Sequence, residues 1–159
     1  MIWRSVFIDA GTGVLAEGLA AAFGVDAARV AVVAAANVVW PDWVQGFEVV
    51  TETWPARGEA RLMATLFVFR DPVGVERLDD RAMAQELANT LGCTVFLADE
   101  ADSYSDNYWR LRPGLPAKRV ALDPDGEGET PPRIMVTGPA TRITPEPEDV
   151  FGAAEAAVE

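Results

Sequence analysis

Carboxylates are the side chains whose number and spacing offer chemistry in this 159-residue chain. It holds 25 Asp and Glu, no His and one cysteine, Cys93. A Ser-His-Asp triad, a Cys-His dyad and His-ligated zinc therefore cannot be built from its residues. A lone cysteine also excludes an internal disulfide and a multi-cysteine metal site. Paired carboxylates, such as those of glycosidases, are the catalytic chemistry that is left.

Two such pairs stand out. Glu48 and Glu52 share one face of a predicted strand, and Asp99 and Asp102 share a polar loop. Pairs of this kind arise by chance in so acidic a chain. We therefore keep a carboxylate-dependent hydrolase, assisted by Mg²⁺, as the alternative function, and the sequence favours a protein that is not an enzyme. The loop lacks the Asp/Asn alternation, glycine and distal Glu of a calcium-binding EF-hand, so we predict no metal and no cofactor.

The negative charge is concentrated in three stretches that contain no Lys or Arg. They cover residues 99–106, 123–129 and 146–159 and hold thirteen of the 25 acids. The twelve other acids face thirteen bases, so the rest of the chain is almost neutral although the net charge is -12. Solubility explains polar loops and a tail of this kind. The alternative interpretation is an acidic surface for a basic partner.

We predict that such a partner contacts acidic and aromatic side chains near loops. Tryptophans at loop edges are common anchors of protein interfaces. The candidate residues are Asp99, Glu100, Asp102, Tyr104, Asp106, Trp40, Trp43 and Trp54.

The acidic balance disfavours nucleic acid and anionic membranes, whose phosphates repel the chain. No apolar run is long enough to span a membrane, and the first residues lack a secretory cleavage pattern. We therefore expect a cytoplasmic, non-catalytic binding or regulatory module. Its profile is similar to that of bacterial immunity proteins, whose acidic surfaces meet basic toxins through complementary charge. A homo-oligomer joined at sheet edges is a further alternative.

The elements that would position these residues alternate between strands and helices. Apolar and β-branched runs predict strands at 3–9, 29–35, 47–54, 59–70, 93–98, 108–112, 118–122 and 133–136. Helical spacing predicts helices at 12–23, capped by Thr12, and at 80–91, capped by Asp79 or Asp80, with Gly24 and Gly92 ending them. Residues 55–58 are predicted to connect a hairpin, and residues 123–129 to form a turn.

This order of elements predicts an α+β fold. We expect a mainly antiparallel or mixed sheet with two helices packed on one face, forming a single domain over residues 1–137. Residues 138–159, rich in Pro and Glu, are predicted to be a linker and an acidic tail that could hold a short helix.

Overall fold

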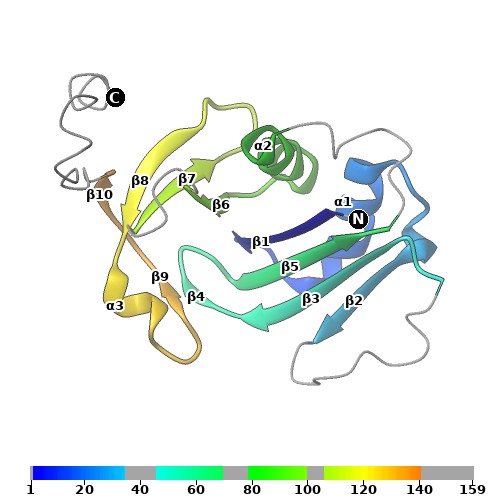
Figure 1. Ribbon diagram of the computed structural model, residues 1–159, viewed down its shortest axis with the longest axis horizontal. Helices are drawn as coiled ribbons and strands as arrows, with labels where there is room; N and C mark the ends of the chain where they lie inside the picture. The colour runs from blue at the N-terminus through cyan, green and yellow to red at the C-terminus, as the bar shows by residue number, and fades with distance from the viewer. Residues whose placement is uncertain (1, 35–45, 70–78, 100–105, 141–159) are drawn as a thin grey trace, which may run out of the picture.

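A computed structural model describes residues 2–34, 46–69, 79–99 and 106–140. Its main element is an eight-stranded sheet with the strand order β10-β8-β7-β6-β1-β5-β3-β2 (Figure 1). Strands β2 and β3 are parallel, and every other neighbouring pair is antiparallel. The bounds are β1 (Ile2–Ile8), β2 (Val30–Ala34), β3 (Val49–Pro55), β5 (Leu62–Val68), β6 (Val95–Ala98), β7 (Asn107–Leu111), β8 (Lys118–Leu122) and β10 (Val136–Pro139). The predicted α+β fold with a mixed sheet is confirmed.

Two helices, α1 (Leu15–Phe23) and α2 (Asp80–Leu91), pack on one face of this sheet. Alternate residues of the central strands meet them, so that Ile8, Leu66 and Val95 are fully buried between sheet and helices. Gly24 and Gly92 end the helices in left-handed conformations, with φ of 69° and 67°, as predicted. Among the described residues no helix is long and apolar enough to cross a membrane.

The helix starts differ in how well the sequence predicted them. The side chain of Asp79 accepts a hydrogen bond of 2.7 Å from the amide of Ala82, so it caps α2 as expected. The predicted cap at Thr12 is wrong, because residues Thr12–Val14 form a separate 3₁₀ turn, η1, and no side chain caps the helix that follows.

The opposite face of the sheet, here called the helix-free face, carries a second and smaller sheet. It pairs β4 (Arg57–Gly58) with β9 (Arg133–Ile134) in parallel. Beneath it lies an apolar cluster of Ala60, Phe96, Val120, Leu122 and Ile134. Strands β3 and β5 form the predicted hairpin, but its connection supplies β4. Gly58 has a φ of +85°, and a Cβ there would overlap the carbonyl group of Ile134, so glycine permits this pairing.

The C-terminal part differs most from the prediction. The acidic segment expected to be a turn contains a short helix, α3 (Pro124–Glu127), in which the Asp123 side chain accepts a hydrogen bond from the Asp125 amide. The single strand expected at 133–136 is divided between β9 and β10, which belong to different sheets. Strand β10 crosses the predicted domain boundary at residue 137. Residues 141–159 lie outside the described residues, so the acidic tail stays a prediction.

Candidate acidic interface

Strands β6, β7 and β8 bring two of the acidic stretches to the same end of the sheet. They form an antiparallel meander in which the end of β6, the start of β7 and the end of β8 are neighbours. The Asp99 amide donates to the carbonyl oxygen of Asn107 (3.1 Å), and the Leu122 amide donates to that of Asp106 (2.9 Å). Segments separated by the whole β7–β8 hairpin therefore meet. We call the described acids of these two stretches the acidic edge: Asp99, Asp106, Asp123, Asp125, Glu127 and Glu129.

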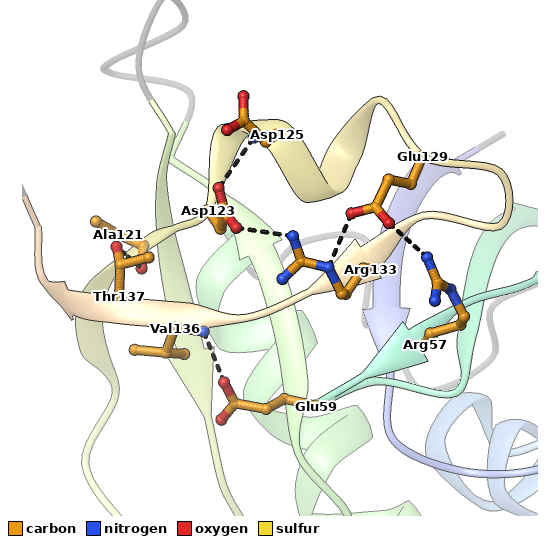
Figure 2. Close-up of polar contacts among 9 residues, drawn as sticks. All are labelled: Arg57, Glu59, Ala121, Asp123, Asp125, Glu129, Arg133, Val136 and Thr137. Carbon is orange, nitrogen blue, oxygen red and sulfur yellow. Dashed lines mark hydrogen bonds and ion pairs between the residues drawn. The ribbon is translucent and has the colours of Figure 1, made fainter.

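Two arginines, the nearby Arg133 and the distant Arg57, neutralise one side of the acidic edge (Figure 2). The Arg133 Nη2 atom lies 2.9 Å from Asp123 Oδ2, and its Nε atom lies 2.8 Å from Glu129 Oε2. Arg57 reaches the other oxygen of Glu129 at 2.6 Å. Hydrogen bonds from Arg133 lower the pKa of Asp123 and of Glu129, and the two carboxylates raise the pKa of Arg133. Acids without a base in their own stretch thus have bases beside them in space.

Asp99 is neutralised in the same way, but at a buried position. Its side chain is 8% exposed, and its Oδ2 atom lies 2.9 Å from both Nε and Nη2 of Arg119. The Arg119 guanidinium stands 5.9 Å from the ring centroid of Trp109, and that of Arg81 lies 4.4 Å from the same ring. Asp99 therefore anchors the end of β6 and presents little of its carboxylate to the surface.

A second corner of the acidic edge joins two carboxyl groups to a tyrosine. The Tyr108 hydroxyl donates to Glu127 Oε1 at 2.5 Å, and Asp106 forms a hydrogen bond with the same carboxyl group. Burial raises the pKa of Glu127, the bond from Tyr108 opposes this, and Asp106 raises it further by charge and hydrogen bonding. Burial and the bond to Glu127 raise the pKa of Tyr108 above its usual range. The folded chain therefore holds the proton of Glu127 more tightly than an exposed carboxyl group would.

The structure brings together only part of the predicted contact set. Trp40, Trp43, Glu100, Asp102 and Tyr104 lie outside the described residues. Asp99 and Asp106 both belong to the acidic edge, but Asp99 pairs with Arg119 and Asp106 with Glu127. Trp54 is partly buried on β3, four strands from β7, which corresponds to about 19 Å at the usual strand spacing.

The glutamates of the alternative, catalytic function also lie away from the acidic edge. Glu48 and Glu52 are half-buried at β3, on the far side of the sheet's centre from the acidic edge. Within the described ranges, no group of three or more His, Cys, Asp or Glu side chains is arranged to hold a metal ion.

Sequence reasoning missed the side chains that contact the acids of the acidic edge. Tyr108 and Val120 are cross-strand neighbours, and strand alternation alone could have placed the tyrosine on the helix-free face. Glu129 and Arg133 are four residues apart, which is a weak local signal. Nothing local connects Arg57 with Glu129, because 72 residues separate them.

The comparisons with known proteins add no relative to this description: no family model, no curated protein and no solved structure matches the chain.

Proposed function

We propose that the chain is a cytoplasmic, non-catalytic binding module whose acidic edge docks a basic protein partner. The observation that supports this function is the convergence of two acidic stretches at one end of the β6–β7–β8 meander. Charge gathered on one edge steers an oppositely charged partner and accelerates its association. The pairing is of the kind that immunity proteins form with basic toxins.

The internal ion pairs indicate what the partner should supply. Asp99, Asp123 and Glu129 each hold an arginine side chain, at distances of 2.6 to 2.9 Å. The local backbone thus presents carboxylates in a geometry that accepts guanidinium groups. Asp106, Asp125 and Glu127 have no ion pair with the described residues. A partner carrying several exposed Arg or Lys side chains would extend the same pattern to these three acids.

A defined cationic probe tests the location of binding. We expect a hexa-arginine peptide, followed by ¹H-¹⁵N NMR, to shift the amide signals of Asp106–Tyr108 and Asp125–Glu129 more than those of α1 and α2. The affinity should fall as NaCl rises from about 50 to 200 mM, because the screening length shortens to below about 10 Å. Equal shifts over the whole surface would contradict a docking edge.

Charge-matched variants test the residues. The double variant Asp106→Asn/Asp125→Asn removes two charges from the acidic edge, and Glu17→Gln/Glu86→Gln removes two from exposed positions on the helices. We expect the first variant to lose binding and the second to bind as the unmodified chain does. A protein partner captured from the source cells should bind the second variant and lose binding to the first. Equal losses of binding in both variants would refute this assignment.

A further inference from the structure

The other end of the β7–β8 hairpin carries two cations side by side. Arg110 of β7 and Lys118 of β8 are register partners. Arg110 also pairs with Phe96, which belongs to the apolar cluster of the helix-free face, so both cations point to that face. Cβ atoms of such partners are about 4.5 to 5.5 Å apart, and like charges at this position destabilise a sheet.

No side chain of the described residues compensates this repulsion. The ion pairs found there involve neither Arg110 nor Lys118. The chain as a whole has twelve more acids than bases, yet no Asp or Glu of the described residues forms an ion pair with either cation.

The Arg110 side chain also has a hydrogen-bond donor without an acceptor. Its Nε atom is closed off from solvent and has no hydrogen-bond partner among the described residues. Phe96, the residue next to it across the strand, is itself 1% exposed and provides an apolar wall. A buried donor without an acceptor destabilises the folded chain, and more strongly when the donor is charged. An oxygen atom from a ligand would remove this cost once the side chains that cover Nε move aside.

We propose that Arg110 and Lys118 form a binding site for a phosphate group. The Nε and Nη atoms of a guanidinium form a planar fork that matches two oxygens of a phosphate, and an ammonium supplies a point charge to a third. Two cations match the roughly -1.5 to -2 charge of a phosphate monoester at pH 7 better than the single charge of a carboxylate. The ligand is therefore a small phosphorylated molecule or inorganic phosphate.

This site is separate from the acidic edge. Lys118 and Leu122 mark the two ends of β8, about 13 Å apart along the strand. The hairpin thus places cations at one end and carboxylates at the other, and the phosphate site does not depend on the proposed partner.

The Arg110 Nε–Hε group provides a direct readout. We expect its NMR signal, identified by its loss in Arg110→Gln, to shift in a saturable way with about 1 to 20 mM inorganic phosphate, the range of a millimolar Kd. Ionic strength is held constant with NaCl. The same titration with glucose 6-phosphate tests the phosphorylated small molecule, and saturation by either probe supports the site. A signal that responds to neither, or equally to NaCl alone, would overturn the proposal.

Three variants complete the test. Lys118→Gln should raise the Kd for phosphate about three- to fivefold, as expected for the loss of one exposed charge contact. Arg29→Gln removes the same charge from an exposed position beside β2 and should leave the Kd unchanged. Asp125→Asn should also leave it unchanged, so that a failure of the phosphate site is distinguishable from a failure of the acidic edge. An unchanged Kd in Lys118→Gln would refute the two-cation site.

Discussion

Replacing Gly126 by Ala tests whether α3 packs against β9. Because this glycine has an ordinary helical backbone, the substitution adds a contact without straining the backbone dihedrals. A Cβ at this position would overlap the carbonyl oxygen of Arg133 and lie 3.1 Å from its carbonyl carbon. The obstacle is therefore backbone of β9. Gly18 of α1 provides the matched control. A Cβ there would overlap Leu91 Cδ2, but that atom is the end of a flexible and only partly buried side chain.

The two substitutions should differ in size although the chemical change is the same. Alanine favours a helix interior over glycine by about 1 kcal/mol, and overpacking costs about 1 to 3 kcal/mol. In Gly18→Ala these effects offset each other once Leu91 changes rotamer, so the net change should stay within about 1 kcal/mol. In Gly126→Ala the carbonyl cannot rotate away, and the four-residue α3 gains little helix stability. We therefore expect Gly126→Ala to lower the free energy of unfolding by about 3 kcal/mol, near the upper end of the range for overpacking.

Urea denaturation followed by tryptophan fluorescence measures both free energies of unfolding. A smaller denaturant midpoint in Gly126→Ala, with an unchanged slope, is the expected result. Because α3 carries Glu127, the Tyr108 hydroxyl should also lose its acceptor, and the tyrosine should ionise at lower pH than in the unmodified chain. If Gly126→Ala is as stable as Gly18→Ala, then α3 does not pack against β9 as described.

Three further outcomes follow from the same contacts. The raised pKa of Glu127 means that the folded chain holds this proton more tightly than the unfolded chain, so its stabilisation is present below about pH 4.5 and is lost as the pH rises through the folded pKa. Glu127→Gln, which keeps an acceptor for Tyr108, should therefore be more stable than the unmodified chain at pH 7 but not at pH 4, and urea titrations that show no such difference would contradict this. Arg133→Gln should show the opposite dependence, losing stability at pH 7 and little at pH 3, because Asp123 and Glu129 have lowered pKa values whose stabilisation disappears as the pH falls. Burial, and secondarily Asp9, raise the pKa of the Cys93 thiol, so a disulfide reagent at pH 8 should modify it more slowly in the folded chain than in urea, and equal rates would refute its burial.

The sequence predicted the elements whose limits are local. Gly24 and Gly92 end their helices because a left-handed residue closes a helix wherever it stands, and Asp79 caps α2 with its own side chain. Runs of apolar residues marked β5 and β6 in the same way. The helix α3 was missed because Asp123, Pro124 and Gly126 have the composition of a turn, and its packing depends on contact with β9.

The acidic edge shows the same limit. Its two stretches are visible in the sequence, and their lack of internal bases indicated an unopposed surface. Arg119 and Arg133 reverse that interpretation at Asp99, Asp123 and Glu129, because strand pairing places them there. Pairing between β4 and β9 joins positions 76 residues apart, and no local pattern reports such a contact. Charge counts along a chain therefore describe a surface only after the register of its strands is known.

Lys118 has a practical consequence for oriented attachment. It is the single lysine of the chain, it is exposed, and it stands at the far end of β8 from the acidic edge. Amine-reactive chemistry therefore has one side-chain target besides the terminal amine. Immobilisation through Lys118 on a sensor surface would leave Asp125 and Glu127 directed toward solution while blocking the cation pair. The position of one residue thus allows the two ends of the hairpin to be assayed separately.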